Sequence, residues 1–164
     1  MIASTAVPAA VPAQAAGPPT LLVLPLDMVD ISGEIPPRTK EHNDRLAALT
    51  QYLARSLAES GSYAIADATP IAAEIDEARS AQRLGDCNGC ERDLARLVHA
   101  DRVLTGELDK VSTLIGSLRL QIIDVATGRR VVARVLSFRG DTDEAWQHAA
   151  RFFLRDLAAD PASR

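Results

Sequence analysis

Two cysteines, Cys87 and Cys90, are the residues whose type and spacing most directly suggest chemistry. A Cys-x-x-Cys pair can form a disulfide, act as a redox-active dithiol, or supply half of a tetrahedral zinc site. Asp86, Glu91 and Asp93 surround the pair with negative charge, which opposes the thiolate that redox chemistry requires. We therefore favour a structural disulfide, with thiol-redox or metal-handling chemistry at these cysteines as the alternative.

A second group of polar residues follows the first apolar run of the chain, in the segment 27–40. Asp27, Asp30 and Glu34 could give a cation three oxygen ligands, although their spacing matches no dedicated calcium loop and a solvated acidic loop is the simpler interpretation. The segment is long for a connection in a small domain, and long ordered loops are often functional. We predict a protein-contact surface here, with these contact residues: Asp27, Asp30, Ile31, Glu34, Ile35 and Arg38.

Other catalytic signatures are missing from the sequence. The histidines, His42, His99 and His148, lie far apart, and on one continuous helix His99 would point away from Cys90. No nucleophile elbow, glycine-rich phosphate loop or His-Glu-x-x-His sequence occurs. We therefore predict no enzyme activity, no cofactor and no bound metal.

The composition is that of one ordinary globular domain. Of the 164 residues, 47% are hydrophobic and 24% are charged, and the formal net charge is −4. A net negative charge gives no indication of the clustered basic face that nucleic-acid binding requires. No segment reaches the roughly 20 apolar residues of a membrane helix. The composition predicts neither a nucleic-acid partner nor membrane insertion.

The first 20 residues are rich in Ala, Pro and Val and carry no charged side chain. The sequence Ala13-Gln14-Ala15 fits the small-x-small pattern of signal-peptide cleavage sites. A flexible tail, or a true start further upstream, is the alternative interpretation, because no basic region precedes the apolar stretch. We expect export to the periplasm.

Hydrophobic periodicity places these residues on a single domain over 21–158, followed by a short disordered tail over 159–164. Its last helix should bury Trp146 and Phe153, and the helix after the cysteines should turn Leu94 and Leu97 inward. The predicted strands are 21–24, 63–66, 101–111, 117–125 and 130–139, and the predicted helices are 40–61, 70–83, 90–100 and 141–158. The order predicts an α/β (α+β) fold with one mixed sheet of about five strands, a C-terminal antiparallel meander, and helices packed on the sheet.

Several short motifs carry a family resemblance over about residues 21–138. They are Leu24-Pro25-Leu26, Cys87, Cys90, Leu97, Ala100-Asp101, Val103, Thr105-Gly106, Ile122, Asp124, Thr127 and Gly128. This pattern resembles the bacterial envelope domain of the TolB N-terminal and curli-secretion (CsgG-like) type, and more closely an uncharacterised family of small secreted proteins with that fold. The resemblance implies a TolB-N-like fold and a role in assembly, secretion or protein contact. Pore formation is not implied, because the chain lacks the long amphipathic segments of the channel-forming relatives.

These observations predict a non-catalytic periplasmic or envelope module that binds or assembles another envelope protein. One alternative is a periplasmic thiol-redox or metal-handling protein that uses Cys87 and Cys90. Another is a small-ligand or cation-binding accessory protein that uses the acidic residues of segment 27–40. The identity of the partner and the oligomeric state do not follow from the sequence.

Overall fold

The computed structural model describes residues 17–160. The helices of this part are α1 (Thr39–Glu59), α2 (Ala72–Ala81), α3 (Cys90–Leu97) and α4 (Asp143–Ala159), with a 3-10 turn, η1 (Thr69–Ile71), before α2. The strands are β1 (Thr20–Val23), β2 (Asp27–Asp30), β3 (Ala64–Ile65), β4 (Arg102–Lys110), β5 (Ile115–Asp124) and β6 (Arg130–Arg139). None of these helices combines the length and the apolar character needed to cross a membrane. Residues 1–16 of the predicted signal segment and residues 161–164 of the predicted tail lie outside the described residues.

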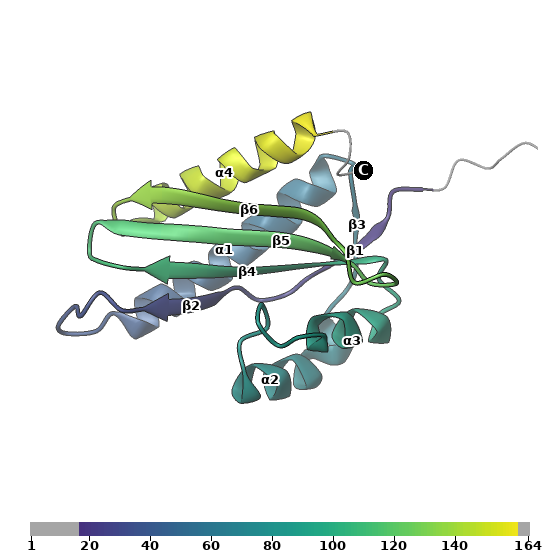
Figure 1. Ribbon diagram of the computed structural model, residues 1–164, viewed down its shortest axis with the longest axis horizontal. Helices are drawn as coiled ribbons and strands as arrows, with labels where there is room; N and C mark the ends of the chain where they lie inside the picture. The colour runs from purple at the N-terminus through teal and green to yellow at the C-terminus, as the bar shows by residue number, and fades with distance from the viewer. Residues whose placement is uncertain (1–16, 161–164) are drawn as a thin grey trace, which may run out of the picture.

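The six strands form one mixed sheet, which confirms the predicted fold class. Its order is β3-β1-β4-β5-β6, and β2 pairs with β4 beyond the end of β1 (Figure 1). Both β1 and β2 run parallel to β4, with Leu22 opposite Val103 and Met28 opposite Leu108. Pro25 lies in the break between β1 and β2, where its missing N–H interrupts no ladder. Residues 20–30 therefore form two successive strands that pair with the first and the last part of β4.

Strands β4, β5 and β6 form the predicted antiparallel meander. Leu118 lies opposite Leu108 on one side and Leu136 on the other, so these side chains share one face of the sheet. The turn between β5 and β6 places Gly128 at φ 73°, a left-handed conformation that glycine adopts without strain. The long strands thus run the full length of the molecule and carry their turns to its two ends (Figure 1).

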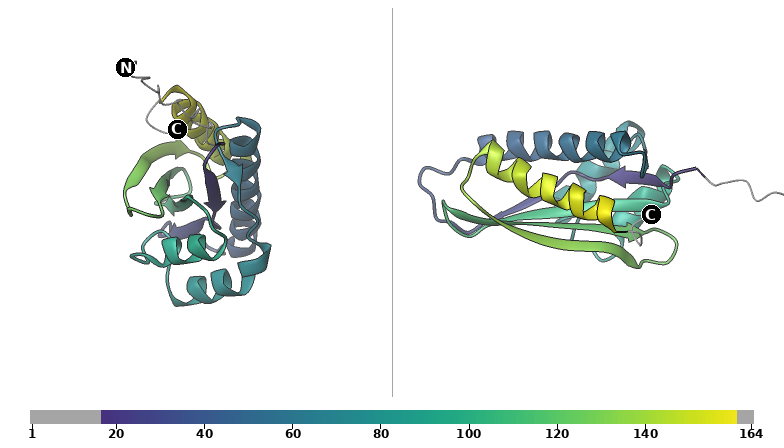
Figure 2. Two further views of the ribbon diagram at one scale, coloured as in Figure 1. Left: turned by 90° about the vertical axis from the view of Figure 1, so that its right-hand side faces the viewer. Right: turned by 90° about the horizontal axis from the view of Figure 1, so that it is seen from above.

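Helices cover both faces of the sheet (Figure 2). Helices α1 and α4 pack on one face, where Trp146 and Phe153 are fully buried as predicted. The predicted apolar stripe of α1 also packs there and consists of Leu46, Leu49, Leu53 and Leu57. Helices α2 and α3 cover part of the other face through a separate core that contains Ile75, Leu84 and Leu94. The result is a three-layer arrangement in which most of the buried apolar area lies beneath α1 and α4.

Two details of the predicted elements are wrong. Residues 27–30 form β2 although the sequence favours a loop there, because a four-residue strand with an aspartate at each end shows too little alternation to detect. Helix α3 ends at Leu97, and the Leu97 side chain is exposed. The side of α3 that faces the sheet instead carries Glu91, Leu94 and Ala95, and it continues to Val98 just after the helix. The helix is therefore rotated so that Leu97 points to solvent.

Candidate functional site

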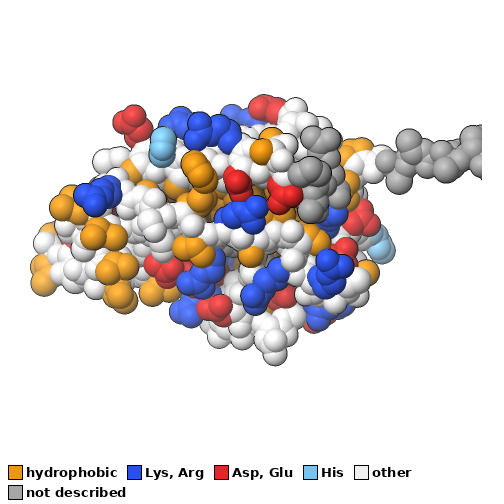
Figure 3. Space-filling view, turned by 45° about the horizontal axis from the view of Figure 1, so that its top comes forward, with side chains coloured by type: hydrophobic (Ala, Val, Ile, Leu, Met, Phe, Trp, Pro, Cys, Tyr) orange, Lys and Arg blue, Asp and Glu red, His pale blue; other side chains and the backbone are white. Residues whose placement is uncertain are grey.

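Exposed apolar side chains gather at the end of the sheet where β4 turns into β5. We call this surface the apolar tip; it consists of Ile31, Ile35, Val111, Leu114 and Ile115. Ile35 is 92% exposed and Leu114 is 67% exposed. Hydrophobic side chains gather at the same end in the space-filling view (Figure 3). A contiguous group of large apolar residues that water still reaches marks a surface adapted for contact.

The tip combines two segments that are far apart in the sequence. Ile31 and Ile35 come from the loop between β2 and α1, and the other three residues come from the β4–β5 hairpin. Because β2 pairs in parallel with the end of β4, both segments leave the sheet at the same point. The backbone N–H of Ile31 donates to the carbonyl of Lys110 over 3.0 Å, which extends this pairing into the tip.

A cluster of ionisable residues lies directly behind the tip, around the buried side chains of His42 and Lys110. We call it the Lys110 network; it consists of Asp30, Glu34, His42, Lys110 and Asp141. The Lys110 side chain is only 3% exposed, and its ammonium donates to Glu34 and, over 3.0 Å, to Asp141. The His42 ring lies 2.8 Å from the same Asp141 oxygen. A buried lysine requires such partners, because its charge would otherwise be removed from water without compensation.

The electrostatics of the network favour the charged forms of Lys110 and Asp141. Burial by itself would lower the pKa of Lys110, but the hydrogen bonds to Glu34 and Asp141 outweigh it and raise the pKa above its ordinary value. Burial would raise the pKa of Asp141, but the contacts with His42 and Lys110 lower it. The network is therefore an ionic lock, in which Lys110 and Asp141 carry opposite charges at neutral pH.

Two arginines close the network on its outer side. Arg45 donates to Asp141 over 2.7 Å and stacks its guanidinium over the Trp146 ring at 4.8 Å. Arg38 pairs with Glu41 and reaches Asp141 at 3.2 Å. The Asp141 carboxylate is thus contacted by Lys110 of β4, by His42 and Arg45 of the first turns of α1, and by Arg38 just before α1. The lock connects four segments: the β2–α1 loop, α1, the end of β4, and the turn into α4.

The network also contains a set of atoms that a metal ion could use. Glu34, His42 and Asp141 each offer one ligand atom, and these atoms lie within 4.8 Å of one another. The ammonium of Lys110, however, already contacts both carboxylates of this set. A cation is thus supplied by the protein itself, and the arrangement suits a structural lock better than a metal centre.

The structure separates the three acidic residues that the sequence suggested as cation ligands. Asp27 lies on the opposite face of the sheet from Asp30, because successive side chains of β2 alternate between the faces. Its carboxylate accepts from the backbone N–H of Leu84 over 2.7 Å and lies 3.8 Å from Arg79. Asp30 and Glu34 instead point to Lys110. The possible cation site with three carboxylates is therefore not formed, since Asp27 is directed away from Asp30 and Glu34.

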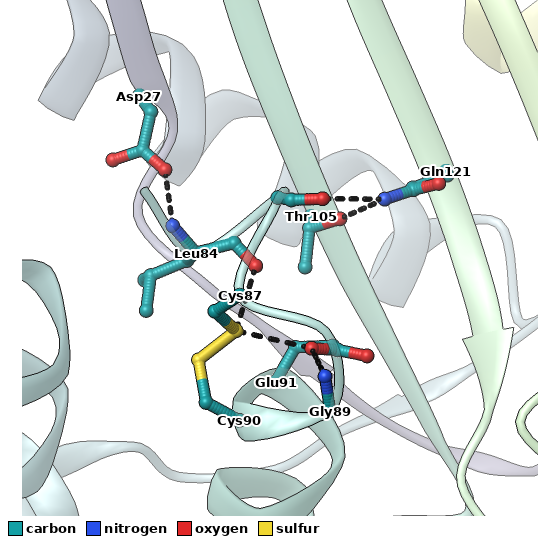
Figure 4. Close-up of a disulfide and its surroundings, with 9 residues drawn as sticks. Asp27, Leu84, Cys87, Gly89, Cys90, Glu91, Thr105 and Gln121 are labelled. Atoms are coloured by element: carbon teal, nitrogen blue, oxygen red, sulfur yellow. Dashed lines mark hydrogen bonds between the residues drawn. A yellow bond between two sulfur atoms is a disulfide. The ribbon is translucent and has the colours of Figure 1, made fainter. Parts of the chain in front are cut away.

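The predicted disulfide between Cys87 and Cys90 is present (Figure 4). It closes the turn into α3, where Asn88 and Gly89 have φ values of 54° and 124°. The Glu91 carboxylate lies 3.1 Å from the Cys87 sulfur and accepts from the backbone N–H of Gly89 over 2.9 Å. A carboxylate in this position disfavours a thiolate, so the surroundings fit a structural bond.

A family model matches nearly all of the described chain. The model is DUF3280, described as "Protein of unknown function (DUF2380)", and it matches residues 19–157. The chain belongs to the DUF3280 family. No curated protein matches it. The DUF3280 description assigns no activity.

Solved structures with the DUF3280 fold are distant in sequence. Lipoprotein GNA1162 from Neisseria meningitidis aligns with a TM-score of 0.54 at 14% identity, over 87% of this chain and 100% of that chain. The LpoB C-terminal domain from Escherichia coli aligns with a TM-score of 0.51 at 17% identity, over 75% of this chain and 84% of that chain. These likenesses establish the fold. An uncharacterised family of envelope type is consistent with them.

The specific resemblance to TolB is supported only in part. TolB from Acinetobacter baumannii aligns with a TM-score of 0.45 at 10% identity, over 85% of this chain and 29% of that chain. A likeness at this level carries no argument about function. What is established is the fold shared with lipoprotein GNA1162 and with the LpoB C-terminal domain.

The sequence reasoning missed the Lys110 network, although one signal pointed to it. Along β4 the side chains of Leu104, Leu108 and Lys110 fall on the same face, so a lysine continues the apolar alternation. His42 lies far from the other two histidines in the sequence, and of the three it is the one that the fold buries. The structure leaves His99 and His148 exposed and brings neither of them to His42.

Proposed function

We propose that this DUF3280 chain is a non-catalytic protein-binding module of the bacterial envelope, exported to the periplasm, that docks another envelope protein through its apolar tip. The observation that carries the proposal is the tip itself, with five large apolar side chains exposed on two loops that the Lys110 network fixes in place. A preorganised apolar surface binds with little loss of conformational entropy. A reaction centre would instead require a concave site with free catalytic groups.

The predicted contact residues divide into three roles under this proposal. Ile31 and Ile35 touch the partner, because their side chains face solvent. Asp30, Glu34 and Arg38 hold the loop through Lys110, Glu41 and Asp141 and act indirectly. Asp27 takes no part, because it faces the α2–α3 side of the sheet.

An envelope location is supported by three separate observations. The fold is shared with lipoprotein GNA1162 and with the LpoB C-terminal domain. The first 20 residues have the composition and the small-x-small site of a cleaved signal. The disulfide between Cys87 and Cys90 suits an oxidising compartment such as the periplasm.

The test is site-specific capture from the native envelope. A photo-crosslinking residue is placed at position 35, at position 114, or at position 97 as a control. Leu97 is the matched control, because its side chain is also large, apolar and exposed but lies on α3, away from the tip. The proposal requires one protein band common to positions 35 and 114 and missing at position 97.

The same partner should then be lost when the tip becomes charged. Ile35→Asp and Leu114→Asp together should weaken capture by at least about tenfold, since the apolar centre of an interface carries most of its binding energy. Leu97→Asp should leave capture unchanged. The melting temperature of each variant is measured as well. Equal capture by the tip variants and the parent chain would overturn the proposal.

The alternatives of a redox or metal role, and of a small-ligand role, have weaker support. Cys87, Cys90 and Glu91 place three possible ligand atoms within 4.8 Å of one another, and a metal would need the reduced form. A thiol count of the native protein decides, because two reactive thiols would favour this role. A cavity of about 610 Å³ between the first turns of α1 and α4 is lined by Arg38 and Arg45, but both arginines already pair with carboxylates.

A further inference from the structure

Strand β6 has a free edge. It is ten residues long, and among residues 17–160 it pairs only with β5. Alternate N–H and C=O groups along its other side therefore have no strand partner. Proteins usually shorten, bend or charge such an edge, because it can accept another strand. No proline interrupts β6.

A groove of about 600 Å³ follows this edge. Five consecutive residues of β6, 135–139, line it. Successive side chains of a strand point to opposite faces of the sheet, so a groove lined by all five must lie along the outer edge itself. The backbone groups of β6 are therefore exposed inside the groove.

The opposite wall of the groove is the first half of α4. Phe152 and Val135 project from the two walls and are 49% and 64% exposed. Leu136 and Phe138 add half-buried apolar surface between them. An extended segment in this position would pair with the backbone of β6 and bury apolar side chains against α4 at the same time.

The charges of β6 are all of one sign. The strand carries Arg130, Arg134 and Arg139 and no acidic residue. Arg134 is neutralised by Asp156 and Asp160 of α4 and its C-cap, whereas Arg130 and Arg139 form no ion pair with any described residue. Glu144 is the acidic residue on the α4 wall of the groove. Of the three arginines of β6, Arg139 is the one that lines the groove, and its side chain favours a partner with carboxylates on the strand side.

We propose that the free edge of β6 accepts an extended segment of a partner protein in which acidic and apolar residues alternate. Because side chains of an added strand alternate between the two faces of the sheet, the acidic residues would lie on the face that carries Arg139, and the apolar residues would lie on the face covered by α4, against Phe152. A second copy of this chain is the less favourable occupant, because antiparallel pairing of two β6 strands brings arginines against arginines. This surface is additional to the apolar tip and is tested separately from it.

The probe is a fluorescein-labelled ten-residue peptide of alternating glutamate and valine, added to the full chain. Binding is followed by fluorescence anisotropy, and the site is located by amide hydrogen exchange. We expect saturable binding and slower exchange for alternate amides of β6. A peptide of alternating lysine and valine should bind at least about tenfold more weakly, because like charges then meet at the strand.

Matched variants identify the groove. Arg139→Glu and Val135→Glu should each weaken binding by roughly tenfold, since both place negative charge at the free edge. Arg55→Glu is the control for Arg139→Glu, because it makes the same change of charge at an exposed position on α1. Ile35→Asp should leave peptide binding unchanged, so that a failure here is distinct from a failure of the tip.

Three results would overturn this inference. The first is the absence of saturable binding at low salt. The second is binding that protects the tip amides and leaves those of β6 unaffected. The third is a concentration-dependent dimer whose β6 amides are protected without peptide, which would show that a second copy occupies the edge.

Discussion

Strand β4 carries two buried ionisable residues, Lys110 and Glu107, on opposite faces of the sheet. The surroundings favour the charged form of Lys110 and disfavour the charged form of Glu107. Lys110 faces α1 and α4, donates to Glu34 and Asp141, and its pKa is raised, so its charged form is favoured. Glu107 faces the α2–α3 side, and burial raises its pKa against the pull of Arg83, so its charged form is disfavoured. The two residues are equally hidden from water.

The difference lies in how the partners are held. The Asp141 carboxylate is itself buried and is fixed by His42, Lys110 and Arg45. Arg83, in contrast, is half exposed, and although it lies 2.8 Å from Glu107 Oε2, that oxygen accepts no hydrogen bond. Burial of a charge is tolerated when oriented hydrogen bonds replace water, and proximity of an opposite charge alone does not achieve this.

The largest effect that separates the two faces is expected from Lys110→Met. The substitution keeps the length of the side chain but leaves Asp30, Glu34 and Asp141 close together without their central cation. We expect a loss of about 3–5 kcal/mol in the free energy of unfolding, the usual result of removing one partner of a buried ion group. Urea denaturation at pH 7 measures it. A loss below about 1 kcal/mol would mean that the network is not a lock.

Asp141→Asn should cost less, about 2–4 kcal/mol at pH 7, because the amide still occupies the site but no longer carries the charge. The pH dependence has a definite sign. Since the folded pKa of Asp141 is lowered, its contribution is complete above the ordinary value near 3.9 and is lost as the pH falls through the folded value. The gap between this variant and the parent chain should therefore narrow in acid. If the difference in the free energy of unfolding between Asp141→Asn and the parent chain were the same at pH 7 and pH 3, the lowered pKa of Asp141 would be contradicted.

On the Glu107 face, replacing both Cys87 and Cys90 by serine should lower the free energy of unfolding by about 1–3 kcal/mol. The bond closes a loop of few residues, so its effect on the unfolded chain is modest. Crosslinking from position 35 should be unchanged, because the bond lies on the other side of the sheet from the Lys110 network. Loss of crosslinking with the fold intact would move the functional surface to α3.

The sequence was informative where periodicity is long and uninformative where function depends on convergence. The alternation of 117–125 and the stripe through Trp146 and Phe153 predicted the meander and the last helix, because each pattern repeats over several turns or residues. The short spacing between Cys87 and Cys90 was enough to predict the disulfide, because it is a local feature of the sequence. The Lys110 network, however, joins Glu34, Lys110 and Asp141, which no local pattern brings together.

The tip shows the same division. Ile31 and Ile35 were predicted as contact residues because they lie in a long loop of mixed charge. Leu114 and Ile115 were not, since they fall in the short connection between the predicted strands 101–111 and 117–125, and no local pattern links that connection to the loop. Parallel pairing of β2 with β4 is what brings the two groups together, and β2 itself was too short to predict.

The smallest effect, and the sharpest test of the comparison, is expected from Glu107→Gln. A group whose folded pKa is raised contributes stability below its unfolded pKa, and that contribution is lost as the pH rises. At pH 7 the carboxylate of Glu107 therefore opposes folding, and its replacement by the neutral amide should be neutral or stabilising, by about 1 kcal/mol or less. The benefit should disappear near pH 4, where the parent residue is also protonated. Urea denaturation at pH 4 and pH 7 measures both values. Arg119 lies 3.4 Å from the other carboxylate oxygen of Glu107. A loss of several kcal/mol at pH 7 would show that Arg83 and Arg119 hold Glu107 as firmly as Asp141 holds Lys110, and the contrast between the two faces would not stand.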